Sequence, residues 1–220
     1  PCLWQPKVAE ALLKGDQEVL CVAATGMGKT LTFWMPLLFR VDGIQVIVTP
    51  LNMLGKQNVA SLAKAGIQAI AINSETATPA NFYAISNFRY RAIIISPEQM
   101  MKPGGDFERL LKDQLFISHL ISIVIDEAHC LTEWGDFRPE YWELGWLCYV
   151  LPPSISLLVT LVTLTKSTIT DITWILHMHK DKTLVIHRSS DRPNIKISIR
   201  KIKYPLNTYT DLAFLIPAGF

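Results

Sequence analysis

Short runs of β-branched and other apolar residues alternate along the chain with longer segments of mixed polarity. Seven of these runs predict β-strands, at 18–23, 45–49, 68–72, 92–96, 122–125, 156–160 and 184–187. Several runs are apolar on both faces, which is typical of strands in a sheet that is covered on both sides.

Helix-length segments lie between the predicted strands. They fall at 5–14, 29–39, 51–65, 79–88, 107–113, 140–149 and 167–177. Strands and helices that alternate in this way imply right-handed crossovers and a parallel sheet. We therefore expect an α/β fold with helices on both faces of a parallel sheet. The alternation does not continue after residue 190, so we expect one domain at 1–188 and a tail at 189–220.

Composition changes this picture little. Half of the 220 residues are hydrophobic and 18% are charged, which excludes a disordered chain. The net charge is +2, with 12 basic against 15 acidic residues up to position 160 and 9 against 4 from Lys166 onward. This modest basic excess either forms a solvated surface or favours a polyanion.

The cysteines and the longest apolar stretch each exclude a class of protein. The four cysteines are scattered without a C-x-x-C spacing, so neither a zinc cluster nor a redox motif is expected, and Cys21 is expected in the core. The stretch 144–164 is long enough to span a membrane, but Pro152 and Pro153 interrupt it. A helix, a turn and a buried strand explain it better, and we expect no membrane partner.

One glycine-containing loop follows the first predicted strand and opens a predicted helix, within AATGMGKT (23–30). Its glycines let the backbone turn sharply and approach a ligand, because they carry no Cβ. Lys29 would contact the β- and γ-phosphates and Thr30 would offer its hydroxyl to Mg²⁺. Short Gly-Lys-Thr strings also arise by chance, but this context predicts a P-loop NTPase. The predicted phosphate-binding residues are Thr25, Gly26, Met27, Gly28, Lys29 and Thr30.

An acidic pair, Asp126 and Glu127, follows the apolar run 121–125. Ligands bind at the carboxyl ends of strands in parallel sheets. Asp126 would hold Mg²⁺ through water, and Glu127 would orient or deprotonate the water that attacks the γ-phosphate. The alternative is a solvated acidic pair at a helix start.

Five strings, in this order, resemble the RecQ family of DNA helicases, within superfamily 2. They are AATGMGKT at 23–30, TPLNMLGKQ at 49–57, SPEQM at 96–100, VIDEAHCLTEWGDFRPEYWELG at 124–145 and DRPNI at 191–195. The phosphate loop is shared by many ATPases, whereas DEAHC followed by WGDFRPEY is far more specific. The resemblance implies ATP and Mg²⁺ as ligands and catalytic roles for Lys29, Asp126, Glu127 and His129, with His129 linking the nucleotide site to the DNA side.

The resemblance also implies contacts with the base and with DNA. Gln5 matches the glutamine that reads adenine, although an exposed amide is an equal alternative. Trp142 and Trp146 have helical spacing and are expected in the core rather than on DNA. The implied DNA-binding residues are Thr49, Pro50 and Gln57, Ser96 in a second motif, and Trp134, Phe137 and Arg138 in an aromatic-rich loop where bases would stack.

Two departures from the family pattern are visible. The family usually has a histidine between Gly135 and Asp136, and its T-A-T motif is matched here by Thr163, Leu164 and Thr165. The shorter loop would weaken the coupling of DNA to hydrolysis.

The chain opens at Pro1 without a methionine and stops at Phe220 with no closing element, so we expect a fragment. The family's second motor domain and four-cysteine zinc module are absent from it. Since an arginine from the second domain completes the ATP site, this chain alone should bind ATP–Mg²⁺ weakly, hydrolyse it slowly and not unwind DNA.

Three hypotheses remain. The first is the ATP-binding motor domain of a 3′–5′ DNA helicase acting on single-stranded DNA or a duplex junction, with a second motor domain as partner and a nuclear location implied by resemblance alone. The second is a truncated or decayed module that binds nucleotide or DNA without turnover. The third is an unrelated P-loop ATPase or kinase, which leaves the string at 134–141 unexplained.

Overall fold

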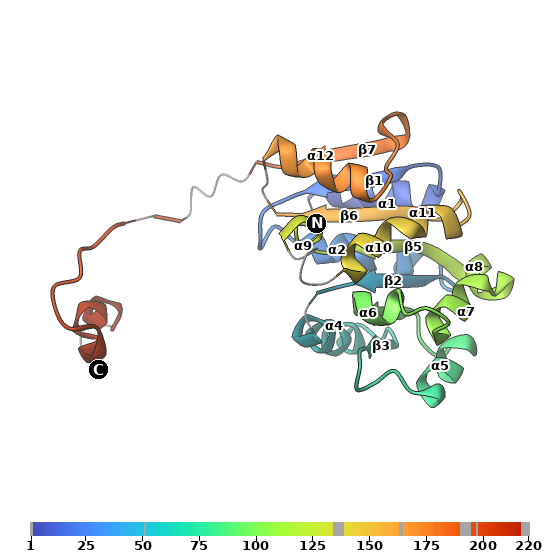
Figure 1. Ribbon diagram of the computed structural model, residues 1–220, viewed down its shortest axis with the longest axis horizontal. Coiled ribbons are helices and arrows are strands. Elements are labelled where there is room, and N and C mark those ends of the chain that lie inside the picture. The colour runs from blue at the N-terminus through green and yellow to red at the C-terminus, as the bar shows by residue number, and fades with distance from the viewer. Residues whose placement is uncertain are drawn as a thin grey trace. The chain divides into compact units, whose positions relative to one another are not determined.

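The computed structural model describes residues 2–50, 52–133, 139–162, 165–189, 195–196 and 198–216. Its centre is a parallel sheet with the strand order β3-β4-β2-β5-β6-β1-β7 (Figure 1). The strands are β1 (Glu18–Val22), β2 (Ile44–Val48), β3 (Ala69–Ile72), β4 (Ala92–Ile95), β5 (Leu120–Ile125), β6 (Ser156–Leu161) and β7 (Thr183–His187). All seven predicted strands and the α/β fold are thus confirmed.

Helices cover both faces of this sheet (Figure 1). Alternate residues of one strand point to opposite faces. In β1, Leu20 and Val22 join one buried apolar cluster, while Val19 and Cys21 join the other. The second cluster contains side chains of α1 (Trp4–Lys14), α2 (Lys29–Trp34), α3 (Pro36–Phe39) and α4 (Asn52–Lys64). Burial on both faces explains why the strand runs lack a polar side.

The other face is covered by shorter helices. They are α5 (Pro79–Ser86), α6 (Pro97–Met100), α7 (Asp106–Lys112), α8 (Gln114–His119), α9 (Cys130–Glu133), α10 (Glu140–Glu143), α11 (Leu147–Val150) and α12 (Lys166–Ile175). The sequence predictions missed α6, α8 and α9, because four to six residues are too few to show a helical period.

Two predicted helices are interrupted. The segment 29–39 divides into α2 and α3 at Pro36, which begins α3 because proline has no N–H to donate within a helix. The segment 140–149 divides into α10, the 3₁₀ turn η1 (Leu144–Trp146) and α11. The core position predicted for Trp142 and Trp146 is wrong, since they are 52% and 65% exposed. Their spacing indicated that they share one helix face, but it did not indicate whether that face turns to the core or to solvent.

The apolar stretch 144–164 forms η1, α11, a turn and β6, as predicted up to residue 162. In the part of the chain that the structure describes, no helix is both long and apolar enough to cross a membrane. Cys21 is fully buried in β1, as expected.

Residues 1–190 and 191–220 form two separate units. In the second unit, the Asp211 carboxylate accepts hydrogen bonds from the backbone N–H groups of Lys203 and Tyr204, at 3.1 and 2.9 Å. The Arg200 guanidinium lies 3.9 Å from the centre of the Phe214 ring. The roles predicted for 1–188 and 189–220 stay predictions.

Candidate nucleotide and nucleic-acid site

The predicted phosphate loop leaves the carboxyl end of β1 and enters α2. Gly26 and Gly28 have φ angles of 81° and 82°, in the left-handed region that glycine adopts without strain. The backbone N–H of Ala23 donates to Leu161 O at 3.1 Å, which ties the loop start to β6. The N–H of Met27 donates to Ala24 O at 3.2 Å and closes the turn. The sharp turn expected from the two glycines is present.

Lys29 is the first residue of α2, and only 8% of it is exposed. Its Nζ donates a hydrogen bond to Ala23 O at 2.9 Å, across the loop. The buried ammonium therefore lies inside the curve of the loop. Thr30, the next residue, is exposed, as is Thr25 earlier in the loop.

Gln5 of α1 holds the loop from the other side. Its Nε2 donates to Gly28 O at 2.9 Å, and its Oε1 accepts from the Cys2 N–H at 2.7 Å. A Cβ on Gly28 would lie only 2.6 Å from this Nε2 atom, and the φ of 82° also favours glycine at this position. Gln5 is 4% exposed, and the alternative of an exposed amide is therefore wrong. Its contact with adenine stays a prediction.

The acidic pair follows β5 at the same edge of the sheet. The N–H of Asp126 donates to Val48 O at 3.0 Å, which continues the pairing of β5 with β2. Glu127 has a φ angle of 51°, which is uncommon for a residue with a side chain and is typical of strained functional positions. Both residues are partly buried, so the alternative of a fully solvated acidic pair does not hold.

Burial dominates the electrostatics of the pair. Desolvation raises the pKa of Asp126, and the Thr160 hydrogen bond and the charge of Lys29 oppose this rise. Desolvation also raises the pKa of Glu127, followed by repulsion from Asp126, while Lys29 again opposes the rise. The Lys29 ammonium thus lies within electrostatic reach of both carboxylates, and the structure brings loop and acidic pair together.

Thr160 of β6 is a contributor that the sequence predictions missed. Its Oγ1 donates to Asp126 Oδ1 at 2.7 Å, and the N–H of Glu127 donates to the same oxygen at 3.0 Å. The available signal in the sequence was a threonine near the end of the mostly apolar run 156–161. Thr160 reaches Asp126 because β6 lies beside β5, and the pattern of apolar residues does not indicate which strands are neighbours.

His129 lies close to Glu127. Its Nδ1 is 3.4 Å from Glu127 Oε2, and neither buried atom has a hydrogen-bond partner among the described residues. Buried polar atoms are normally paired, so these two atoms are suited to an additional ligand. This orphaned carboxylate oxygen, beside Asp126 and Lys29, fits residues that hold a nucleotide with a divalent metal ion.

The predicted DNA-binding residues divide into three groups. Thr49, Pro50 and Ser96 are buried where the neighbouring strands β2 and β4 end, and the N–H of Thr49 donates to Ile95 O at 3.1 Å. The Thr49 hydroxyl is buried without a hydrogen-bond partner in the described part of the chain. Gln57 lies in α4 and is exposed. Trp134, Phe137 and Arg138 lie outside the described residues, as do Thr163 and Leu164.

Comparisons with known proteins agree with this arrangement. The sequence model of the family described as DEAD/DEAH box helicase matches residues 3–172. The chain is 34% identical over 211 residues to the ATP-dependent DNA helicase RecQ of Haemophilus influenzae, covering 94% of this chain and 32% of that protein. It is 33% identical over 201 residues to a probable ATP-dependent DNA helicase, RecS, of Bacillus subtilis, covering 89% and 38% respectively. The resemblance to RecQ helicases is confirmed.

A solved structure shares the fold. The helicase MrfA, in a crystal structure bound to DNA and AMPPNP, aligns with a TM-score of 0.61 and 16% identity, over 84% of this chain and 27% of that one. At this identity the likeness supports the fold alone. The chain spans about a third of the length of the two sequence relatives that it matches.

Proposed function

The chain belongs to the DEAD/DEAH box helicase family, and from this premise we propose that it is the ATP-binding motor domain of a RecQ-like 3′–5′ DNA helicase. The observation that carries the proposal is the position of the buried Lys29 ammonium. It lies inside a left-handed glycine loop and within electrostatic reach of Asp126 and Glu127, at one edge of a parallel sheet. This arrangement suits a metal-bound triphosphate.

Each residue has a distinct role in this proposal. Lys29 would exchange its hydrogen bond with Ala23 O for the β- and γ-phosphate oxygens. Thr30 and Asp126 would hold Mg²⁺, with Thr160 fixing the Asp126 carboxylate. Bound Mg²⁺ would neutralise charge on the triphosphate.

Glu127 would act as the general base on the attacking water. Burial raises its pKa, which makes the ionised carboxylate a stronger proton acceptor than a solvated one. His129, 3.4 Å from Glu127 Oε2, would connect the base to the neighbouring DNA-binding edge.

The DNA-binding surface would include the residues that directly follow β2 and β4. Thr49, Pro50 and Ser96 lie at the same sheet edge as the nucleotide residues, since β2 lies between β4 and β5. Trp134, Phe137 and Arg138 would stack on bases and contact phosphate. Movement along DNA would require the second motor domain of a longer chain, and a nuclear location is proposed from the resemblance alone.

Nucleotide binding tests the central step. We expect Lys29→Ala to weaken binding of a fluorescent ATP analogue with Mg²⁺ by about 10- to 100-fold, because hydrogen bonds to charged groups contribute about 1.5–3 kcal/mol. The matched control is Lys14→Ala, since Lys14 is exposed on α1 and pairs with Glu10. Equal affinity of Lys29→Ala and the unaltered chain, with both folded by circular dichroism, would refute the proposed site.

Hydrolysis separates a motor from a decayed binding module. In a chain extended by a second motor domain, single-stranded DNA should accelerate ATP hydrolysis. Nucleotide binding without any such acceleration would favour the binding module instead, for which the shortened loop at 134–141 and Leu164 are the motivating features.

A further inference from the structure

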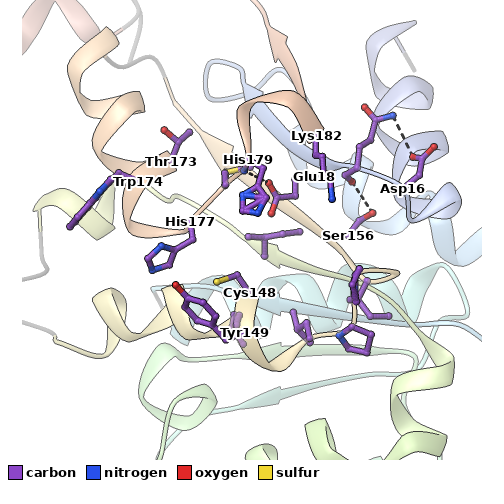
Figure 2. Close-up of a pocket in the computed structure, with 18 residues that line it drawn as sticks. Asp16, Glu18, Cys148, Tyr149, Ser156, Thr173, Trp174, His177, His179 and Lys182 are labelled. Carbon is purple, nitrogen blue, oxygen red and sulfur yellow. Dashed lines mark hydrogen bonds between the residues drawn. The ribbon is translucent and has the colours of Figure 1, made fainter.

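A second hollow lies at the opposite edge of the sheet from the phosphate loop. It is a cavity of about 740 Å³, lined at the amino ends of β1 and β6 by Glu18 and Ser156 (Figure 2). The nucleotide residues lie at the carboxyl ends of the same strands, where β1 leads into the loop and β5 leads into Asp126. An occupant of this cavity would therefore not compete with ATP.

The cavity combines an apolar base with exposed aromatic side chains. Leu147, Leu157 and Met178 contribute apolar surface to its lining. Tyr149 and Trp174 line it as well, yet they are 70% and 72% exposed. Tryptophan and tyrosine beside a pocket are the residues that most often dominate the binding energy of protein–protein interfaces.

Tyr149 and Trp174 form the aromatic wall of the cavity, and neighbouring rings pack against Tyr149. The Tyr149 ring packs edge-on against Trp146 and His177, with centroid distances of 6.3 and 5.2 Å. A Cβ on Gly145 would overlap the Ile175 carbonyl oxygen, so α12 and the helical segment that contains Gly145 pack in close contact. His177 follows α12 in the left-handed region at a φ of 51°, a strained position for a residue with a side chain. A preformed wall loses little conformational entropy on binding.

Carboxylates outnumber cationic side chains around this cavity. Asp16 and Glu18 line it against one lysine, Lys182 (Figure 2). Glu18 is fixed, because its Oε2 accepts from the His179 N–H at 3.0 Å and from the Thr183 hydroxyl at 3.2 Å. Burial and then the negative charge of Glu18 raise the pKa of the Cys148 thiol, which also lines the cavity. The negative charge of Glu18 therefore acts on a group that lines the cavity.

We propose that this cavity is a docking site for a protein partner that inserts an arginine side chain, flanked by apolar residues, between the aromatic wall and Glu18. A guanidinium is planar, stacks on aromatic faces and pairs with carboxylates, whereas an ammonium is more strongly hydrated. The flanking apolar residues would cover the exposed faces of Tyr149 and Trp174. Single-stranded nucleic acid fits poorly, because its phosphates would meet Asp16 and Glu18.

Two blocked tripeptides test the charge requirement in the 220-residue chain. The first is acetyl-Leu-Arg-Leu-amide, and the second replaces arginine by citrulline, which has the same shape without the charge. We expect the arginine peptide to shift the indole N–H signal of Trp174 in NMR spectra and to bind about fivefold more tightly, as expected for a cation on an aromatic face. Equal affinity of the two peptides would overturn the proposal, and so would a thymidine oligonucleotide that shifts this signal as strongly.

Charge variants give effects of opposite sign. Glu18→Gln keeps an acceptor for His179 N–H but removes the charge, so it should weaken arginine binding, whereas Lys182→Gln should strengthen it. Trp174→Ala should also weaken binding and leaves the fold intact, because Trp174 is largely exposed. Since this variant lacks the Trp174 signal, isothermal titration calorimetry measures the affinity of all variants. Glu108→Gln on α7 is the control and should change nothing. If Glu18→Gln and Trp174→Ala both bind as tightly as the unaltered chain while remaining folded, the proposal fails.

Discussion

The two edges of the parallel sheet carry different kinds of residues. At the carboxyl edge, loop backbone and buried polar groups converge: the Gly26–Gly28 turn, the ammonium of Lys29 and the carboxylate of Asp126. At the amino edge, large side chains such as Tyr149 and Trp174 surround an open cavity. Both edges belong to the same strands, yet among the described residues the polar groups surround a buried cation at the carboxyl edge and an open cavity at the amino edge.

This contrast has a physical origin. The loops that follow parallel strands all begin at the same edge of the sheet, where their backbone groups are exposed. Glycine lets such a loop turn closely around a ligand. At the amino edge, side chains from the ends of helices α11 and α12 line the cavity. Changes at the carboxyl edge should therefore affect nucleotide chemistry, and matched changes at the amino edge should not.

The largest effect is expected from Glu127→Gln. Removal of the general base should reduce single-turnover ATP hydrolysis by at least about 10²-fold, since positioned bases contribute about 10²–10⁴-fold. Nucleotide affinity should remain nearly unchanged, because the amide keeps the size of the side chain. Rapid-quench measurement of phosphate release with protein in excess over ATP provides the rate.

Glu18→Gln is the matched change at the other edge. It also replaces a carboxylate by an amide, but Glu18 begins β1 and contacts His179 and Thr183. Hydrolysis should stay within twofold of the unaltered chain. A loss of hydrolysis in both variants, with both folded, would contradict the separation of the two edges.

Parts of this arrangement could be predicted from the sequence, and others could not. The strands and the loop at 23–30 are local patterns, so apolar runs and glycine spacing were sufficient. The hydrogen bond from Thr160 to Asp126 depends on which strands are neighbours, and the burial of Gln5 depends on how α1 packs on the loop. Helical spacing placed Trp142 and Trp146 on one face but wrongly in the core, because neighbouring elements decide which face is covered.

Thr160→Val should have the next largest effect. Valine keeps the shape of threonine but removes the donor to Asp126 Oδ1, so the carboxylate loses its orientation. Partners of metal-binding residues typically contribute 10–100-fold, and we expect Mg²⁺-dependent nucleotide affinity to fall about 10-fold. Titration of the fluorescent ATP analogue at fixed and varied Mg²⁺ concentrations measures the loss.

Thr183→Val controls for the general effect of losing a strand hydroxyl. Thr183 begins β7, and its Oγ1 donates to His179 O at 2.7 Å at the amino edge. This variant should lose stability without losing nucleotide affinity. Parallel losses of affinity in the two threonine variants would show that Thr160 acts through the fold and not through Asp126.

Asp126→Asn should stabilise the protein in the absence of nucleotide and metal. Burial raises the pKa of Asp126 from an ordinary value of 3.8, so the folded chain binds the proton more tightly than the unfolded chain does. The stability contributed by this group is therefore full below the unfolded pKa and is lost as pH rises through the folded pKa. At pH 7.5 the ionised carboxylate is unfavourable, and asparagine removes that charge while its Oδ1 still accepts from Thr160.

We expect Tm to rise by about 2–4 °C at pH 7.5, which corresponds to about 1 kcal/mol in a chain of this length. At pH 4 the difference should shrink, because lowering the pH favours protonation of a carboxyl group whose pKa is raised. Differential scanning calorimetry in EDTA at both pH values measures it. A lower Tm for Asp126→Asn at pH 7.5 would mean that the ionised carboxylate stabilises the fold, contrary to the direction of its pKa.

The smallest effect is expected from Trp142→Ala, which tests whether an exposed tryptophan of α10 belongs to the fold. With 52% of the residue exposed, the substitution should change the free energy of unfolding by no more than about 0.5 kcal/mol, as surface changes usually do. Tyr141→Ala is the contrasting neighbour, because Tyr141 is 1% exposed, and truncation of a large core aromatic costs about 3–5 kcal/mol. Urea unfolding compares the two, and a similar loss in both would place Trp142 in the core after all. A Trp142→Ala variant as stable as the unaltered chain would show that this tryptophan contributes little to the fold.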